Sequence, residues 1–348
     1  MTTRAIVLGP CKSTKIFSRS ISRSGRAGGF RTFSTTPSRA MAMAGKLRIG
    51  FVPEHFSTPL AFAQRHFNLN ADLIPFPTGT GALASALKQP SADDGSIDVA
   101  IGLTEGFVAD LGKAKASGTP SSYGLVGTYV ESPLCWAIST GAQRSDITSV
   151  SSLKGSKVGV SRIGSGSYVM SFVLADQQGW LASKEPFSVA PIGDFAALRK
   201  SVNEQTSDFF MWEHFTTKHF WDNGEIKRIG EIYTPWPSWV ITARDAKDGR
   251  VEEMLGKINA GVRHYRENRE EAVEYITSTM HYSKEDALEW MKTVRFAEDV
   301  KGVKASMVDH TIGILRKAGV LDESAGGSEH MIHIQKEEEQ NIGNPADV

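Results

Sequence analysis

From residue 46 onward, short apolar runs alternate with longer stretches that show a helical spacing of apolar residues. This alternation is typical of βαβ units and predicts an α/β fold with largely parallel, doubly wound sheets. Strands are expected within residues 46–52, 71–76, 98–103, 123–129, 134–140, 151–160, 187–192, 207–211 and 234–242. Helices are expected between most of these strands and again over residues 250–318.

Several phrases of the sequence resemble a known fold. Residues 47–54 (LRIGFVPE), 97–105 (IDVAIGLTE) and 153–160 (LKGSKVGV) resemble the type II periplasmic-binding-protein fold, and the third phrase is similar to the segment that opens the second lobe of sulfonate- and thiamine-precursor-binding proteins. Residues 211–218 (MWEHFTTK) and 234–239 (TPWPSW) resemble, more narrowly, a fungal family of periplasmic-binding-protein-like proteins.

The resemblance implies two lobes joined by two crossing segments. Residues 46–138 and 236–322 would form lobe I, residues 139–235 would form lobe II, and residues 323–348 would be a flexible tail. Thiamine-pyrimidine synthases share this fold in fungi, but they carry a Cys-Cys-Cys-Phe-Cys signature. This chain has only two cysteines, Cys11 and Cys135, so the synthase activity is not carried over.

The N-terminal segment differs in charge from the rest of the chain. Residues 1–41 hold eight Lys or Arg residues, and the first acidic residue is Glu54. This composition is typical of a mitochondrial transit peptide, with cleavage expected between Phe33 and Ser34 and a matrix location. A basic, disordered arm on a cytoplasmic protein is the alternative. The whole chain has 39 basic and 39 acidic residues, which gives no reason to expect a nucleic-acid partner.

Site residues are expected in the loops that follow the strands, because ligands of open parallel sheets bind beyond the carboxyl ends of the strands. Two of these loops are Gly-rich turns that open a helix and predict an anion site, with simple helix capping as the alternative. The flat faces of the tryptophans are expected to pack against a ring of the ligand. The glutamates are expected to accept hydrogen bonds from an amine or a ring N–H of the ligand. The predicted ligand-binding residues are Glu54, His55, Thr78, Gly79, Thr80, Thr104, Glu105, Ser165, Gly166, Ser167, Tyr168, Trp212, Glu213, Trp236 and Trp239.

No cofactor or metal is predicted. Gly79 and Gly81 fit part of a dinucleotide fingerprint, but Asp98 begins the next strand instead of ending it. His214 and His219 lack the spacing of a helical zinc motif, and Cys135 lies in an apolar run where a buried, inert thiol is expected. No run of about 18 apolar residues is present in the sequence, so no membrane-spanning helix is expected.

These observations predict a non-catalytic solute-binding protein that closes two lobes on a small polar or anionic ligand, with a heteroaromatic ring as one option. The first alternative is an enzyme on the same fold that acts on a pyrimidine or amine precursor. The second is a protein-interaction module that uses the helical C-terminal region. The sequence indicates neither the identity of the ligand nor the oligomeric state.

Overall fold

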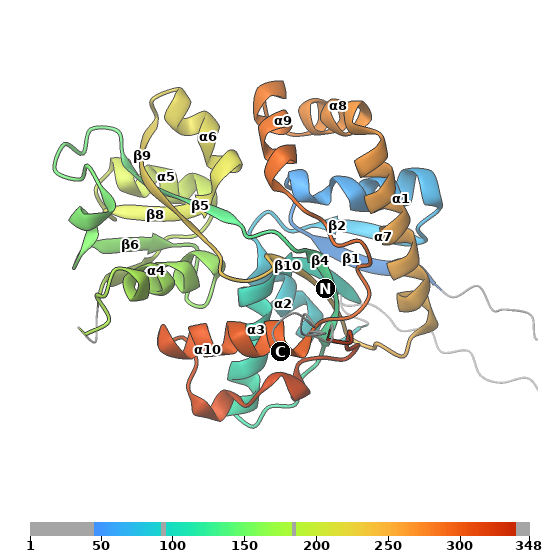
Figure 1. The fold of residues 1–348 in the computed structure, drawn as a ribbon. Coiled ribbons are helices and arrows are strands. Elements are labelled where there is room, and N and C mark those ends of the chain that lie inside the picture. The colour runs from blue at the N-terminus through green and yellow to red at the C-terminus, as the bar shows by residue number, and fades with distance from the viewer. Residues whose placement is uncertain (1–44, 92–94, 183–185, 339–348) are drawn as a thin grey trace, which may run out of the picture. The chain divides into compact units, whose positions relative to one another are not determined.

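The computed structural model describes residues 45–91, 95–182 and 186–338. The predicted leader lies outside the described residues, as do residues 339–348 of the predicted tail. The described residues form two five-stranded sheets with helices packed against them, which confirms the two-lobed α/β prediction (Figure 1). Within these ranges, no helix is long and apolar enough to cross a bilayer.

Lobe I is built on a mixed sheet. Its strands are β1 (Leu47–Phe51), β2 (Ala71–Pro75), β3 (Val99–Leu103), β4 (Gly124–Val130) and β10 (Trp239–Ala243). The spatial order is β2-β1-β3-β10-β4, with β1 parallel to β2 and β3, and β10 antiparallel to β3 and β4. Every residue of β4 is buried, as expected for a strand covered on both faces.

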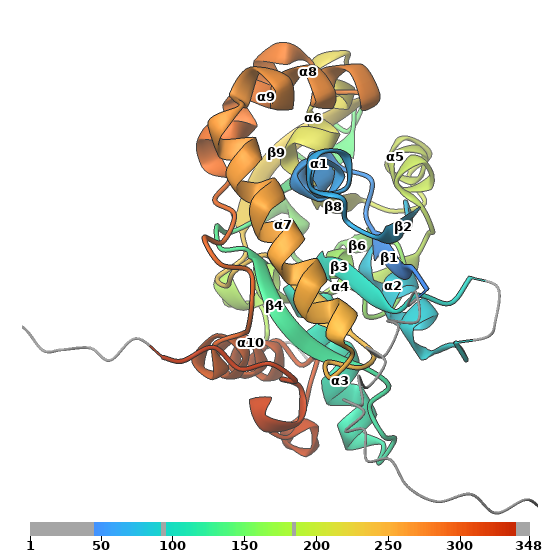
Figure 2. The same cartoon turned by 90° about the vertical axis from the view of Figure 1, so that its right-hand side faces the viewer.

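Seven helices of the described chain accompany this sheet. They are α1 (Thr58–Phe67), α2 (Thr80–Lys88), α3 (Thr104–Ala116), α7 (Gly249–Glu267), α8 (Arg269–Thr279), α9 (Lys284–Thr293) and α10 (Ala305–Lys317). Helix α7 packs along α1 (Figure 2). A glycine makes this approach possible, because a Cβ atom added at Gly261 of α7 would lie 2.2 Å from the carbonyl oxygen of Pro59.

Lobe II is built on the second sheet, in the order β7-β6-β8-β5-β9. Its strands are β5 (Cys135–Gly141), β6 (Lys157–Val160), β7 (Ser188–Pro191), β8 (Phe209–Glu213) and β9 (Ile226–Tyr233). Its helices are α4 (Gly166–Gln177), α5 (Phe195–Asn203) and α6 (His214–Asp222). In Figure 1, α4 and α5 lie on opposite sides of β6 and β8, so these strands are enclosed between helices.

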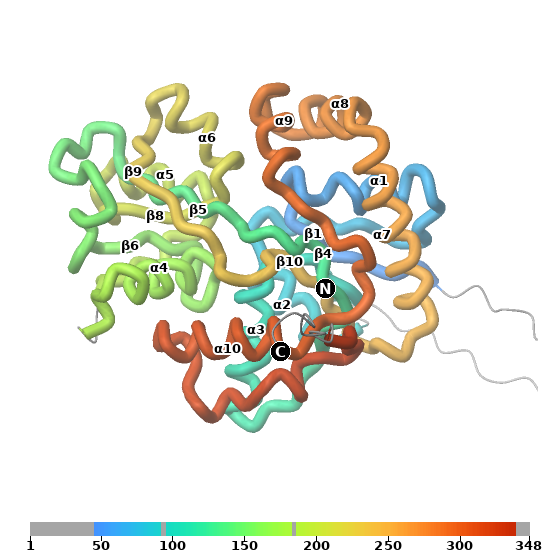
Figure 3. The backbone as a smooth tube through the Cα atoms, viewed as in Figure 1, coloured from blue at the N-terminus to red at the C-terminus, as the bar shows by residue number. Residues whose placement is uncertain are grey.

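The crossing between the lobes differs from the prediction. The sequence placed residues up to 138 in lobe I, but β5 begins at Cys135 and pairs only with strands of lobe II. The crossing segments are therefore residues 131–134 and 234–238, which run side by side (Figure 3). The backbone N–H of Thr234 donates to the Leu134 oxygen at 3.0 Å, and the Leu134 N–H donates to Thr234 Oγ1 at 2.9 Å.

The C-terminal segment also differs from the prediction of a flexible tail over residues 323–348. Residues 331–334 pair with Leu125 on the edge of β4 that β10 leaves free, and residues 296–302 pair with later positions of the same edge. The Leu125 N–H donates to the Met331 oxygen, and the His333 N–H donates to the Leu125 oxygen, both at 2.8 Å. Burial of Met331 adds an apolar contact to these hydrogen bonds. The described part of the tail therefore covers a sheet edge that would otherwise expose unpaired backbone groups.

Candidate functional site

A cavity of about 50 Å³ lies where the two lobes meet. Both lobes contribute to its wall, through the segments that follow β1, β2 and β6, the ends of β3 and β8, and the starts of β5 and β10. Ten of the fifteen predicted site residues line it: Glu54, Thr78, Gly79, Thr80, Ser165, Gly166, Ser167, Trp212, Glu213 and Trp239. The cavity is small because the lobes are in contact around it, so the structure represents a closed arrangement.

The other predicted site residues lie behind this wall. Thr104 Oγ1 donates to the Pro237 oxygen at 2.5 Å, and Trp236 Nε1 donates to Glu105 Oε2 at 3.0 Å. These contacts attach the second crossing segment to the start of α3. Tyr168 stands outside the cavity, with its ring centroid 4.9 Å from that of Phe172.

His55 is the remaining predicted residue outside the cavity wall, and it is 1% exposed. Its ring centroid lies 4.1 Å from that of Trp290 and 4.5 Å from that of Tyr282. Burial lowers the pKa of His55 well below its usual value, so the ring is neutral at pH 7. Its Nε2 atom is 3.8 Å from Glu213 Oε1, a carboxylate oxygen of the cavity wall. His55 therefore supports the site from behind.

The starts of α2 and α4 bring backbone and hydroxyl groups to the cavity. Gly79 caps α2 with a φ of 83°, a left-handed conformation that glycine adopts without steric cost. Ser165 caps α4, where its hydroxyl accepts from the Tyr168 N–H at 3.3 Å and lies 3.0 Å from Ser167 Oγ. The positive ends of two helix dipoles thus flank the cavity from opposite lobes, which favours a negatively charged ligand group.

Arg162 is the cationic side chain of the cavity wall. Its Nη1 donates to the Thr78 oxygen of the other lobe at 3.1 Å, and a Cβ added at Gly81 would lie 1.9 Å from its Nη2. Burial lowers the Arg162 pKa, but an arginine keeps its charge at neutral pH. Arg162 was not among the predicted ligand-binding residues.

Two glutamates oppose this positive charge. Burial, with a smaller contribution from the neighbouring Glu213 carboxylate, raises the pKa of Glu54 to about 8, although a hydrogen bond from Trp212 acts in the opposite direction. Burial likewise raises the pKa of Glu213 to about 7, although this side chain caps α6 by accepting from the Thr216 N–H at 2.6 Å. Near neutral pH the pair therefore retains a proton, and a protonated carboxyl is a hydrogen-bond donor.

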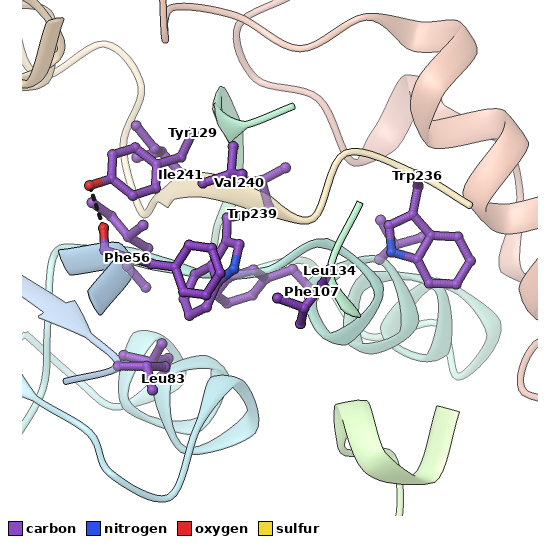
Figure 4. Close-up of a cluster of buried hydrophobic side chains, with 14 of the residues drawn as sticks. Phe56, Leu83, Phe107, Tyr129, Leu134, Trp236, Trp239, Val240 and Ile241 are labelled. Carbon is purple, nitrogen blue, oxygen red and sulfur yellow. Dashed lines mark hydrogen bonds between the residues drawn. The ribbon is translucent and has the colours of Figure 1, made fainter. Parts of the chain in front are cut away.

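Two indole donors of the cavity wall are unused. Trp136 and Trp239 are 4% and 2% exposed, and the Nε1 atom of each is buried without a hydrogen-bond partner among the described residues. Trp136 was not among the predicted ligand-binding residues. Trp239 also belongs to the apolar core, where its ring centroid lies 5.0 Å from that of Phe56 (Figure 4). The core therefore fixes the position of this indole.

The chain is similar to proteins of known structure. A family model described as Ca3427-like PBP matches residues 136–232. The structure of the Candida albicans CA3427 gene product, described as defining a new family with the generic periplasmic binding protein fold, is 39% identical, with a TM-score of 0.73. That match covers 84% of this chain and 99% of the Candida chain. No curated protein matches the chain.

Bacterial binding proteins show the same fold at lower identity. The alkanesulfonate-binding protein SsuA from Xanthomonas axonopodis pv. citri, bound to MOPS, is 15% identical with a TM-score of 0.62, and the match covers 80% of this chain and 95% of that one. The periplasmic nitrate-binding protein NrtA from Synechocystis PCC 6803 is also 15% identical, with a TM-score of 0.60 and coverage of 80% and 83%. These descriptions name no enzyme, so the alternative of an enzyme acting on a pyrimidine or amine precursor gains no support.

Proposed function

Because this chain belongs to the family of periplasmic-binding-protein-fold proteins that the Candida albicans CA3427 gene product defines, we propose that it binds a small anionic solute between its lobes. The observation that carries the proposal is the pair of unused indole donors, Trp136 and Trp239, in the wall of the cavity that also holds Arg162. Buried polar groups in folded proteins nearly always have a partner. An oxygen acceptor on the ligand would supply it.

The charge distribution supports an anion over a cation. Arg162 and the starts of α2 and α4 place positive charge or partial charge beside the cavity. Glu54 and Glu213 do not cancel it fully, since burial raises the pKa of both carboxyls toward or above 7. A protonated Glu54 would donate a hydrogen bond to the ligand. The indole N–H groups, the Arg162 guanidinium and the protonated Glu54 carboxyl are thus three kinds of hydrogen-bond donor beside the same small cavity.

The size of the cavity limits the buried group. A cavity needs roughly 10–15 Å³ of free volume to hold one water molecule, so the space of about 50 Å³ suits a compact group such as carboxylate, sulfonate or nitrate. The faces of Trp212 and Trp239 are also in the wall and would contact a ring or an alkyl chain attached to that group. Closure around the ligand would exclude water and strengthen each polar contact.

Arg162→Gln tests the proposal. A hydrogen bond to a charged group contributes about 1.5–3 kcal/mol, so the variant is expected to lose at least about tenfold in affinity. The ligand is first sought by native mass spectrometry of the full chain purified from its own host. Isothermal titration then uses the released compound or, if none is released, nitrate, sulfate and methanesulfonate.

Arg295→Gln is the matched control, because Arg295 lies outside the cavity and its side chain is 66% exposed. The Arg295 variant should bind the anionic ligand with the same affinity as the unmodified protein. Equal affinities for the Arg162 and Arg295 variants would contradict the site assignment. The absence of both a released compound and any titratable anion would contradict the proposed anionic ligand.

A further inference from the structure

Three side chains with metal-ligating atoms meet in lobe II outside the cavity described above. They are Cys135 at the start of β5, His214 at the start of α6 and Glu231 in β9. Cys135 Sγ lies 3.7 Å from Glu231 Oε2, and His214 Nδ1 lies 3.8 Å from the same oxygen. The three ligating atoms all lie within 4.8 Å of one another.

The sheet brings these residues together although the sequence separates them. Strand β5 is antiparallel to β9, with Cys135 opposite Tyr233 and Ala137 opposite Glu231. Cys135 and Glu231 are therefore diagonal neighbours that project from the same face of the sheet. On its other side β5 pairs with β8, whose last residue, Glu213, precedes His214. Cys135 and Glu231 stand on the sheet and His214 directly follows its strand β8, so all three belong to lobe II and their spacing does not depend on closure of the lobes.

The spacing fits a tetrahedral zinc ion. Zinc binds sulfur at about 2.3 Å, imidazole nitrogen at about 2.0–2.1 Å and carboxylate oxygen at about 2.0–2.2 Å. Tetrahedral angles then place neighbouring ligand atoms roughly 3.4–3.6 Å apart. The observed separations of 3.7 and 3.8 Å are within a few tenths of an ångström of these values. A set of sulfur, nitrogen and oxygen ligands favours zinc over magnesium or calcium, which prefer oxygen alone.

A second observation also points to a missing partner. The Nδ1 atom of His214 is buried and makes no hydrogen bond to any described residue. A cavity of about 400 Å³ lies beside the cluster and is lined by all three residues, with Glu289 and Trp290 among the others. Protein groups thus leave room for a fourth ligand, either water or a solute.

The charged and polar neighbours of the cluster balance one another. Arg228 forms an ion pair with Glu231, and the Tyr233 hydroxyl lies 3.4 Å from Glu231 Oε1. His214 also experiences the positive charge of Lys218 and the negative charge of Glu289. Arg228 contacts Glu231 through Oε2, the same oxygen that lies 3.7 Å from Cys135 Sγ and 3.8 Å from His214 Nδ1, so metal binding would require the guanidinium to move to Oε1 or away from the carboxylate. A bound cation would require Cys135 as a thiolate, which adds the negative charge that compensates the ion.

We propose that Cys135, His214 and Glu231 form a Zn²⁺ site with one coordination position open to the adjacent cavity. The site is separate from the anion site and does not depend on it, since Arg162, Trp136 and Trp239 are not members of the cluster. It adjoins the anion site through Leu134 and Glu213, which line both cavities.

The test is a zinc titration of the full chain in competition with a chromogenic chelator. Cys135→Ser preserves the size of the side chain but removes the thiolate. Loss of a second-shell group typically costs a metal site 10–100-fold in affinity, so loss of this ligand should cost at least about tenfold. His66→Ala is the control, because His66, His264 and Glu271 form a second possible metal cluster elsewhere in the described chain. This variant should bind zinc like the unmodified protein.

Cobalt substitution provides a spectroscopic readout that can be measured on the unmodified protein. Co²⁺ bound to the unmodified protein should show a thiolate-to-metal charge-transfer band, which chelator removes and Cys135→Ser lacks. Zinc binding that survives Cys135→Ser but is lost in His66→Ala would overturn the proposal, as would a cobalt complex without the thiolate band. Arg162→Gln, which should weaken anion binding, is expected to bind zinc like the unmodified protein. Failure of the zinc proposal can therefore be distinguished from failure of the anion proposal.

Discussion

Glu54 is an acidic side chain in surroundings that solvate a negative charge poorly. Trp212 donates a hydrogen bond to it, but burial and the Glu213 carboxylate both favour the protonated form. The pKa of about 8 in the folded protein lies above the ordinary value of 4.5. Between these two values the unfolded chain loses a proton that the folded protein keeps. The free energy of unfolding must therefore fall as the pH rises through this interval.

Glu54→Gln should remove this pH dependence. Above about pH 6.5 the buried, neutral His55 no longer contributes, because the unfolded chain is then neutral at this position as well. From pH 6.5 to 8, the unmodified protein should lose stability by on the order of 1–2 kcal/mol more than the variant does. Urea unfolding followed by circular dichroism at several pH values measures the difference. Parallel pH profiles for the two proteins would show that Glu54 ionises normally.

Helix α7 contains two glycines whose surroundings are opposite. Gly261 faces α1, where an added Cβ would lie 2.2 Å from the Pro59 oxygen and 2.8 Å from the Ala63 nitrogen. Gly256 faces open space, since an added Cβ would meet nothing within 4 Å. Both positions have the same helical backbone, so alanine gains the same helix propensity at each. The difference between the two variants therefore isolates the packing of α7 on α1.

Gly261→Ala should destabilise the protein by about 1–3 kcal/mol, because the backbone atoms of α1 cannot move aside as a flexible side chain can. Gly256→Ala should stabilise it by up to about 1 kcal/mol through the lower flexibility of the unfolded chain. Thermal or denaturant unfolding of both variants provides the comparison. Equal effects of the two substitutions would mean that the helices shift apart without cost.

The elements also show how far the sequence predicts the fold. Strands such as β1 and β3 are compact apolar runs, and their positions were predicted to within a residue or two. Strand β9 was missed because its sequence, IKRIGEIY, mixes charged and apolar residues, as befits an edge strand in which only Ile226 and Ile232 are buried. Ten of the predicted site residues line the cavity, most of them at or just after the carboxyl ends of strands. Arg162 was not predicted because its contact with Thr78 spans 84 positions and exists only when the lobes meet.

The closed arrangement of the whole molecule depends on close approaches between the lobes. Thr216 Oγ1 of lobe II lies 2.9 Å from the Tyr282 hydroxyl of lobe I, and Lys218 forms a 3.2 Å ion pair with Asp286. Gly166 provides the tightest apolar approach at the cavity, because an added Cβ would lie 2.9 Å from Leu103 Cδ1. Leu103 ends β3 of lobe I, whereas Gly166 begins α4 of lobe II.

An added Cβ at Gly166 would also lie 2.9 Å from Trp136 Cη2 of its own lobe, so Gly166→Val should hold the lobes apart and shift the Trp136 indole. We expect a larger radius of gyration by small-angle X-ray scattering and a weaker affinity for the solute identified by mass spectrometry. Gly313→Val serves as the control, since an added Cβ at this position of α10 meets nothing within 4 Å. A Gly166 variant with unchanged scattering and unchanged affinity would show that closure tolerates the added side chain.

The position of β10 in the first sheet has a consequence for biosynthesis. This strand lies between β3 and β4, yet it follows all five strands of the other sheet in the chain. At roughly 5–20 residues per second, a ribosome needs roughly 5–20 s to advance from the end of β4 to the start of β10. During that interval β3 and β4 lack their shared neighbour, whereas β5 to β9 are completed in an unbroken run. The inserted lobe can therefore fold first on the nascent chain, and the exposed edges of β3 and β4 are where a chaperone would be needed.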